Sequence, residues 1–527
     1  MSHKQSVKTV VCCVLAFAGY LSATVFAQLV DRTKAHSTIN EGIARPLIGG
    51  DYPSEIGDGR SGPDPNASLN VIAFDPFRAI RRGRQLFQRK FTRAEGSGPG
   101  FGDGSGDIDT DLAIGAGLTD SCAACHGRPR GAAGVGGDVA TRPDSRDAPH
   151  LFGLGLKEML ANEITADLRA IRDSATAQAI SNATPVVRQL TSKGISYGTI
   201  GVAADGTVDT SHVEGVDDDL RVRPFFAHGG AASIREFVVG ALKNEMGLAM
   251  AGDPDLTTAQ TGRVVTPSGM VLDGRIDKVD GAPPEEGDIG TVDQRTALVD
   301  YLEFYLLNYF KPGAGEQTSE VKRGRKLFQQ AACTSCHIAN LQINRDRRVA
   351  DVDTAFDPDR GGFNRLFATA RLLLANPASI GQPLVAKRPA LQPFLVRDIY
   401  TDFKRHDVGA AFYERNYDGT LRTKFMTLPL WGIGTSAPYG HDGRSINLAE
   451  VILRHGGEAQ QSRDAFASMD SPNRNALIAF LESLTLFPPD DTASNLDPGD
   501  RSAASYPQVR HGSIKLTVLF NSPAIPE

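Results

Sequence analysis

The chain has 527 residues, of which 41% are hydrophobic, and a formal net charge of −6 at pH 7. This length is enough for roughly three or four domains with ordinary apolar cores, so the composition predicts a globular protein. Lysine and arginine number 56 against 62 acidic residues, so no basic surplus attracts nucleic acid or an anionic membrane surface, and we expect neither as a partner.

The N-terminus has the pattern of an export signal. A charged start with two lysines leads into an apolar stretch from Val10 to about Val25, and Val25-Phe26-Ala27 supplies a small-residue cleavage site. We expect residues 1–27 to be a signal peptide, residues 28–74 to be an N-terminal extension, and the mature protein to be periplasmic. An uncleaved anchor helix is the alternative, because the stretch nearly reaches spanning length. No later stretch is apolar enough to predict stable membrane insertion.

The four cysteines outside this segment form two Cys-x-x-Cys-His motifs, Cys122/Cys125/His126 and Cys333/Cys336/His337. Two thiols three positions apart on a helical turn reach both vinyl groups of a haem, and the adjacent histidine places its imidazole on the iron. A redox cysteine pair or half a zinc site beside a chance histidine would explain one motif but not two. We therefore predict two covalently bound haem c groups, with His126 and His337 as iron ligands.

A glycine- and aspartate-rich insert precedes the first motif, at Gly96 to Asp111. Its composition predicts a solvated loop. A calcium site is a second interpretation of the same aspartates.

The chain contains a duplicated unit. Arg82-Gly83-Arg84-Gln85-Leu86-Phe87-Gln88 precedes the first haem motif, and Arg323-Gly324-Arg325-Lys326-Leu327-Phe328-Gln329 precedes the second. Each copy closes with a matching helical pattern, at 295–303 and at 474–482, and the second helix should start at Ser471 as N-cap with Pro472 in its first turn. We predict a mainly α fold with two tandem class I cytochrome c-like domains carrying long loops and insertions. The first domain spans 75–311 and the second 318–488, and a tail follows over 489–527.

Both copies contain a glycine turn followed by a capping box. The first copy reads His228-Gly229-Gly230 and then Ser233 to Glu236, and the second reads His441-Asp442-Gly443 and then Asn447 to Glu450. Helices should therefore begin at Ser233 and at Asn447.

The two helices differ at one position. In the second helix His455 continues the apolar stripe of Leu448, Val451 and Ile452, so it is either the sixth ligand of the second iron or a hydrogen-bonded core histidine. Met426 is the rival ligand. Counting from the two caps, the position of His455 holds Ala241 in the first helix, and an alanine offers no ligand atom.

This asymmetry predicts an open first iron that binds peroxide or oxygen. Glu245, one turn beyond Ala241, would then move the proton needed to split the O–O bond. The alternative is a carboxylate near solvent or paired with Lys243 or Arg235. His150 or His228 as a sixth ligand would close the site.

The roles of Arg444 and Trp431 each have two interpretations, whereas His406 and Asp407 have no predicted role. Arg444 would either bind a haem propionate or lie on the surface. Trp431, the single tryptophan, would either relay electrons between the haems or simply pack. The sequence assigns no role to His406 or Asp407.

Together these segments resemble the di-haem oxidoreductases of the bacterial cytochrome c peroxidase and MauG superfamily, most closely the di-haem thiol oxidoreductase branch. The most specific stretches are Asp120 to His126, Leu151 to Leu156, Tyr400 to Asp402, His406 to Gly409, Leu428 to Gly432, His441 to Arg444 and His455 to Ala459. The resemblance implies that Glu245 is the active-site glutamate and His455 the distal ligand of the electron-transfer haem. Two features depart from the peroxidases: Phe225-Phe226-Ala227 lacks their tryptophan, and histidine in place of methionine lowers the haem potential.

The leading hypothesis is a periplasmic, peroxidase-like oxidoreductase. It would activate peroxide at the first haem and draw electrons through the second from a small redox donor protein, or from a protein or small-molecule substrate. An electron-transfer di-haem cytochrome without peroxidase activity is one alternative. A di-haem oxygenase resembling the rubber oxygenases is the other.

Overall fold

A computed structural model describes residues 76–91, 119–127, 146–246, 253–279, 292–308, 317–345, 393–416 and 419–486, with a few isolated residues and short strands between them. The predicted signal peptide, the glycine-rich insert and the tail over 489–527 lie outside the described residues, as does nearly all of the predicted extension over 28–74. Within the described residues no helix combines the length and the apolar character that crossing a membrane requires.

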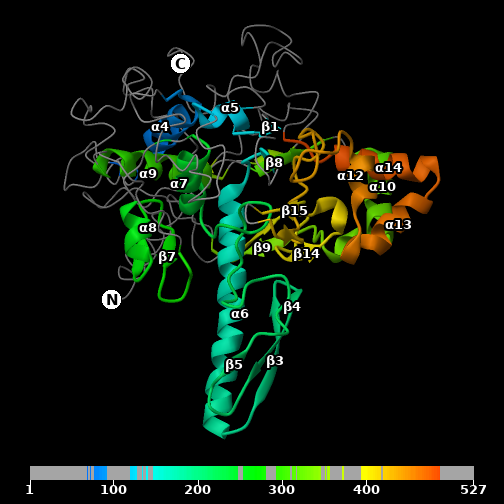
Figure 1. Ribbon diagram of the computed structural model, residues 1–527. Helices are drawn as coiled ribbons and strands as arrows, with labels where there is room; N and C mark the ends of the chain where they lie inside the picture. The colour runs from blue at the N-terminus through cyan, green and yellow to red at the C-terminus, as the bar shows by residue number, and fades with distance from the viewer. Residues whose placement is uncertain are drawn as a thin grey trace, which may run out of the picture.

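Each copy of the repeat is built on a pair of packed helices (Figure 1). Helix α4 (Pro76–Gln88) packs on α9 (Val292–Asn308), and α10 (Ser319–Gln330) packs on α14 (Ser471–Glu482). Each pair packs closely at a glycine that occupies the same position in both copies. A Cβ on Gly83 would lie 2.1 Å from the Tyr301 carbonyl oxygen, and a Cβ on Gly324 would lie 1.8 Å from the Ala476 carbonyl oxygen. Both predicted closing helices are confirmed.

The two predicted capping boxes start helices α7 (Ile234–Asn244) and α12 (Leu448–Arg454). The Ser233 hydroxyl accepts the backbone N–H of Glu236, and the Glu236 carboxylate accepts that of Ser233. The Asn447 side chain likewise accepts the N–H of Glu450, but the Glu450 carboxylate accepts the N–H of Ile446 in place of that of Asn447, so only the N-cap half of the second predicted capping box forms. The prediction for α14 was wrong by one residue, because Asp470 is its N-cap and Ser471 its first residue.

The mainly α, cytochrome c-like fold prediction is wrong. The described residues also contain eight small β-sheets, seven of two strands and one of three. All pair antiparallel except β8 with β11. The strands are β1 (Asp138–Val139), β2 (Arg146–Asp147), β3 (Val186–Ser192), β4 (Ile195–Val202), β5 (Val208–Asp209), β6 (Arg263–Val265), β7 (Val271–Asp273), β8 (Lys311–Ala314), β9 (Leu341–Ile343), β10 (Ala350–Asp351), β11 (Asp353–Ala355), β12 (Arg371–Leu372), β13 (Phe394–Val396), β14 (Arg405–Asp407), β15 (Glu414–Arg415), β16 (Leu421–Arg422) and β17 (Lys424–Met426). The remaining helices are α5 (Cys122–His126), α6 (Leu154–Asn182), α8 (Pro254–Ala259) and α13 (Gln460–Ser468), with 3-10 turns η3 (Cys333–Ser335), η4 (Ala410–Phe412) and η5 (Gly457–Ala459).

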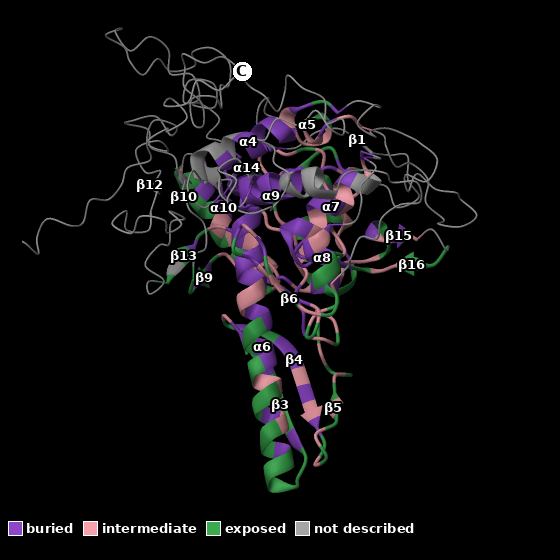
Figure 2. Cartoon of the chain, turned by 90° about the vertical axis from the view of Figure 1, so that its left-hand side faces the viewer, coloured by how far each residue is buried: buried purple, intermediate pink, exposed green. Residues whose placement is uncertain are grey.

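The largest of these additions is an arm that extends from the body of the molecule (Figures 1 and 2). It consists of the 29-residue helix α6 and the antiparallel sheet β3-β4-β5. Lys193 and Gly194 join β3 to β4 with φ angles of 51° and 81°, the positive values that a tight two-residue hairpin needs. Buried Leu190, Tyr197 and Val202 face the helix, so apolar burial and a local turn hold the sheet on α6.

Three apolar clusters form the core. The first joins α4, α7 and α9, and the third joins α10, α12 and α14. The second lies at the base of the arm and contains residues of α6 together with Ile399, Met426 and Trp431 from the second copy. The arm therefore connects the two copies through shared buried surface.

Candidate haem-binding sites

Each Cys-x-x-Cys-His motif folds as a single helical turn. Residues Cys122–His126 form α5, and the Ser121 hydroxyl caps it by accepting the N–H of Ala124 at 3.1 Å. The second motif begins as η3, and the His337 N–H donates to the Cys333 carbonyl at 3.0 Å. All four cysteines are half-buried and free of disulfides. Each turn therefore presents two thiols and one imidazole at the spacing that haem attachment needs.

The two motif histidines have equivalent surroundings. The ring of Phe87 lies 6.5 Å from that of His126, and the ring of Phe328 lies 6.0 Å from that of His337. In each histidine Nδ1 donates to a backbone carbonyl, that of Pro149 at 2.7 Å for His126 and that of Tyr400 at 3.1 Å for His337. This bond orients the ring and assigns iron binding to Nε2, so both sites fit a haem with a proximal histidine.

Burial sets the protonation of these groups. It lowers the pKa of His126, and it lowers the pKa of His337 to about 4, so both rings are neutral at pH 7 and able to bind a metal. Burial also raises the pKa of Cys122 to about 12 and that of Cys333 to about 11. Thiols with a raised pKa are protonated at pH 7, unlike the thiolate of a redox cysteine.

His455 follows the helix that packs with the second haem motif. It ends α12 as the C-cap residue, its Nδ1 donates to the Val451 carbonyl at 2.8 Å, and its ring meets that of Phe412 edge-on at 5.2 Å. Val451 and Ile452 of this helix pack in the apolar cluster that also contains Cys333 of the second motif. The structure therefore places the predicted distal histidine at the end of a helix that belongs to the second haem site.

Met426 lies elsewhere. Its backbone N–H in β17 donates to the Ala227 carbonyl at 2.8 Å, and its sulfur lies 3.5 Å from the place that a Cβ on Gly229 would take. The side chain belongs to the cluster at the base of the arm, whereas Val451 of α12 belongs to the third cluster. This placement favours His455 over Met426 as the distal ligand.

The end of α7 contacts the first haem motif. Glu245 is the C-cap of α7, its N–H donates to the Ala241 carbonyl at 3.0 Å, and its own carbonyl accepts the N–H of Thr119 at 3.3 Å. The Met246 sulfur lies 3.9 Å from the Cys122 sulfur. Next to burial, the Glu245 carboxylate is the main influence that raises the pKa of Cys125. The half-buried Glu245 is thus placed beside the first motif.

Arg235 forms its ion pairs with carboxylates other than Glu245. Its guanidinium is fully buried and binds Asp253, Asp300 and Glu303, each at 2.9 Å or less. The side chain of Lys243, the other predicted partner, lies outside the described residues.

His150 uses both ring nitrogens. Nε2 donates to the Trp431 carbonyl at 2.8 Å, and Nδ1 accepts the N–H of Phe152 at 3.3 Å. Burial lowers its pKa to about 4, consistent with this neutral tautomer. His228 stacks on Phe226, with the rings 6.0 Å apart and 14° from parallel. The contacts of His150 are those of a structural residue and leave no nitrogen for iron.

Arg444 and Trp431 are in contrasting environments. The Arg444 side chain is 62% exposed and lies 3.5 Å from the Asp442 carboxylate, which Arg454 approaches more closely, at 2.7 Å. Trp431 is buried, and a Cβ on Gly153 would lie 2.7 Å from its ring. Its indole therefore packs where the first copy meets the second.

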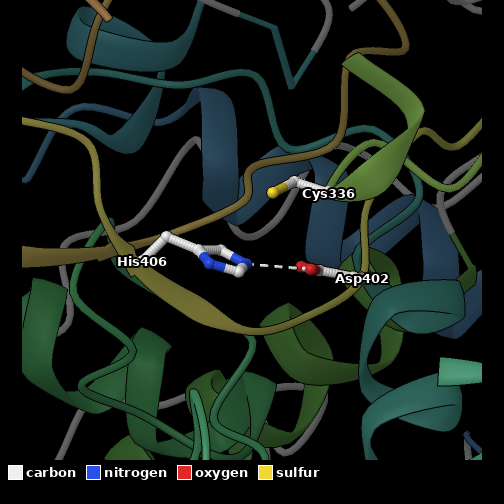
Figure 3. A group of neighbouring side chains, drawn as sticks. All are labelled: Cys336, Asp402 and His406. Carbon is white, nitrogen blue, oxygen red and sulfur yellow. Dashed lines mark hydrogen bonds and ion pairs between the residues drawn. The ribbon is translucent and has the colours of Figure 1, made fainter. Parts of the chain in front are cut away.

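His406, for which the sequence analysis predicts no role, lies beside Cys336 and Asp402 (Figure 3). One ligand atom from each of these three residues lies within 4.8 Å of the others, a spacing that a metal ion could use. However, His406 Nε2 faces the Asp402 carboxylate at 2.9 Å and Nδ1 faces that of Glu458 at 2.7 Å. Each ring nitrogen therefore faces a carboxylate, which needs a proton on both nitrogens, and we assign an ion-pair cluster. Burial opposes a charge here, but the hydrogen bond to Asp402 outweighs it and raises the pKa of His406 to about 11.

This ion-pair cluster brings together two of the specific sequence stretches, His406 to Gly409 and His455 to Ala459. The Glu458 carboxylate also accepts the N–H of Asp407 at 2.9 Å, and the Gly456 N–H donates to the Val408 carbonyl at 2.8 Å. A Cβ on Gly409 would lie 2.9 Å from the Gly456 Cα, so the segments touch backbone to backbone. Residues 406–409 therefore hold the loop that follows His455. The paired glycines are a sequence signal for this contact.

Comparison with known proteins finds one family that part of the chain resembles. A family model described as "Di-haem oxidoreductase, putative peroxidase" matches residues 381–484, which include His406, Trp431, His455 and α14 but neither Cys-x-x-Cys-His motif. No curated protein matches the chain. Over its second copy the chain is therefore similar to the di-haem oxidoreductases, a family whose description implies haem cofactors and a peroxidase-like activity.

Proposed function

We propose that this protein is an exported, periplasmic di-haem c-type oxidoreductase that reduces peroxide at the first haem with electrons passed through the second. The electron source would be a small redox donor protein, or a protein or small-molecule substrate. Among di-haem oxidoreductases, we assign it to the cytochrome c peroxidase and MauG superfamily and, within that superfamily, to the thiol oxidoreductase branch. The N-terminal pattern of residues 1–27 supports export.

One observation carries the proposal, the difference between α7 and α12. Both helices begin at a capping residue, and eight positions later α12 has His455 where α7 has Ala241. His455, at the end of the helix that packs with the second motif, would cap the second iron. The methyl group of Ala241 cannot coordinate a metal, and His150, one of the two rival histidines, has both nitrogens bound to backbone. These contacts support our proposal that the first iron accepts an exogenous ligand.

Glu245 is the group that would handle protons at this site. When bound, haem supplies an iron that accepts and reduces peroxide. Reducing one peroxide to two waters takes two electrons and two protons. A carboxylate beside the first motif can take a proton from one peroxide oxygen and deliver it to the other. The contacts of α7 with the Thr119 to Cys122 segment hold the Glu245 backbone next to that site.

Substitution of Glu245 tests this assignment. Glu245→Gln should leave both haem spectra intact and reduce peroxide turnover by about two to four orders of magnitude, since it removes the proton acceptor. Glu320→Gln, the same change at an exposed site in the first turn of α10, is the control and should leave turnover unchanged. Wild-type turnover in Glu245→Gln would exclude Glu245 from the mechanism.

Electron paramagnetic resonance of the oxidised holoprotein tests the asymmetry itself. We expect one high-spin iron and one low-spin iron, and carbon monoxide should bind to the reduced protein. Two low-spin irons with no carbon monoxide binding would instead establish an electron-transfer cytochrome. Dioxygen consumed in substrate cleavage, with no peroxide turnover, would establish an oxygenase.

A further inference from the structure

The proximal histidines of the two motifs are linked through the interior of the protein. The link begins at His126, whose Nδ1 donates to the Pro149 carbonyl at 2.7 Å. Pro149 is covalently joined to His150, whose Nε2 donates to the Trp431 carbonyl at 2.8 Å. At this point the path crosses from the first copy of the repeat to the second.

The second half of the link has the same alternation of peptide bonds and hydrogen bonds. Trp431 is joined to Leu430, whose N–H donates to the Ile399 carbonyl at 3.0 Å. Ile399 is joined to Tyr400, whose carbonyl accepts the Nδ1 proton of His337 at 3.1 Å. Four hydrogen bonds of ordinary length therefore connect one predicted iron ligand to the other.

Only one side chain lies between the two ends of the link. Ile399 is 0% exposed and Tyr400 and Trp431 are each 2% exposed, whereas His150 and Leu430 are half-buried and Pro149 is exposed. Pro149, Trp431, Leu430, Ile399 and Tyr400 all contribute backbone atoms. The imidazole of His150 alone contributes through its side chain, and Phe152 fixes its orientation from the other ring nitrogen.

We propose that this chain of bonds carries electrons from the second haem to the first, with His150 as its positioning residue. The inference rests on the proposed function, because it requires a haem on each motif. One electron would leave the second iron, which is oxidised, and would reduce the first, while the His150 proton stays on Nε2. The small redox donor replenishes the second haem, and peroxide is the final two-electron acceptor. Electron tunnelling decays less steeply along covalent and hydrogen bonds than across a gap, which favours this route.

The test is the rate of electron transfer between the haems, measured without peroxide. Pulse radiolysis of the oxidised holoprotein would place one electron on the second haem, and absorbance would follow its transfer to the first. His150→Leu removes the hydrogen bond to Trp431 and should slow this rate by about tenfold or more, a change that kinetics resolves readily. His150→Gln retains an N–H donor and should keep most of the rate.

Two control variants separate this route from others. Trp431→Phe keeps the carbonyl and should transfer electrons at nearly the wild-type rate. His212→Leu, at an exposed site on the arm, should have no effect. An unchanged rate in His150→Leu, or a slow rate in Trp431→Phe alone, would overturn the proposal.

Spectra distinguish this proposal from its rivals. Optical and electron paramagnetic resonance spectra of His150→Leu should match the wild type at both haems. A changed spin state at the first haem would identify His150 as an iron ligand and overturn the proposal. A wild-type protein with no peroxide turnover would overturn the proposed function. If electrons still passed quickly between its haems, at a rate that depends on His150, the proposed electron-transfer route would stand.

Discussion

Arg235→Met should destabilise the first copy of the repeat severely. Arg235 lies in α7 with an exposed fraction of 0%, and its guanidinium binds two helices. It meets Asp253, the N-cap of α8, at 2.8 and 2.7 Å, and it meets Asp300 and Glu303 of α9 at 2.9 Å each. These bonds hold the helix that ends at Glu245, so their loss would also disturb the first haem site.

The magnitude follows from burial. The side chains of Asp253, Asp300 and Glu303 are each 0% exposed, so removing the arginine leaves carboxylates without their counter-charge in the interior. Removing one partner of a buried ion pair costs about 3–5 kcal/mol. That is a large part of the roughly 5–15 kcal/mol that stabilises a typical domain. Burial raises the pKa of Glu303 to about 7, and its protonation relieves part of the cost, so the loss should be smaller at pH 5 than at pH 8.

Denaturant unfolding of the holoprotein, followed by circular dichroism and by haem absorbance, would measure this loss. Arg172→Met is the matched control, because Arg172 of α6 pairs only with Asp173 at 2.8 Å among its described contacts and that partner is 67% exposed. An exposed pair of this kind contributes about 0–1 kcal/mol. A loss below about 1 kcal/mol in Arg235→Met, or equal losses in both variants, would refute the reasoning.

Two further predictions concern helix packing and pH. Gly324→Ala should cost about 1–3 kcal/mol in unfolding free energy, because its Cβ would lie 1.8 Å from the Ala476 carbonyl oxygen. Gly240→Ala, where a Cβ meets nothing within 4 Å, should instead stabilise α7 by about 0.5–1 kcal/mol, and equal effects would contradict the packing argument. Burial raises the pKa of Glu303 from 4.5 to about 7, so the folded state binds a proton on Glu303 more tightly than the unfolded state does. The free energy of unfolding should therefore fall as the pH rises from 4.5 to about 7. Glu303→Gln should remove this part of the pH dependence in thermal unfolding, and an unchanged slope would exclude Glu303 as its source.

Local features of the site could be predicted because their causes lie within a few residues. The Cys-x-x-Cys-His turns need only one helical turn, and the N-cap bonds of Ser233 and Asn447 join groups three positions apart. The closing helices α9 and α14 follow from periodicity over three or more turns. The error at Asp470 is also local, since aspartate and serine are both good capping residues and only the backbone path selects between them.

The fold class could not be predicted in the same way. Most strands have two or three residues, which is too short for an alternating apolar pattern to show. The β3-β4 hairpin is an exception, because its β-branched residues and its Lys193-Gly194 turn are visible in the sequence. The prediction of a mainly α fold overlooked that signal.

The sequence by itself determined which residues can hold haem and where the helices beside them begin, because those properties depend on neighbours along the chain. Only the tertiary structure decided which distant groups meet. It joined His406 to Glu458, placed the Arg235 charge among four carboxylates, and set His150 against the Trp431 carbonyl. Such contacts arise when buried polar groups must find partners in a packed interior, and sequence separation does not restrict that choice.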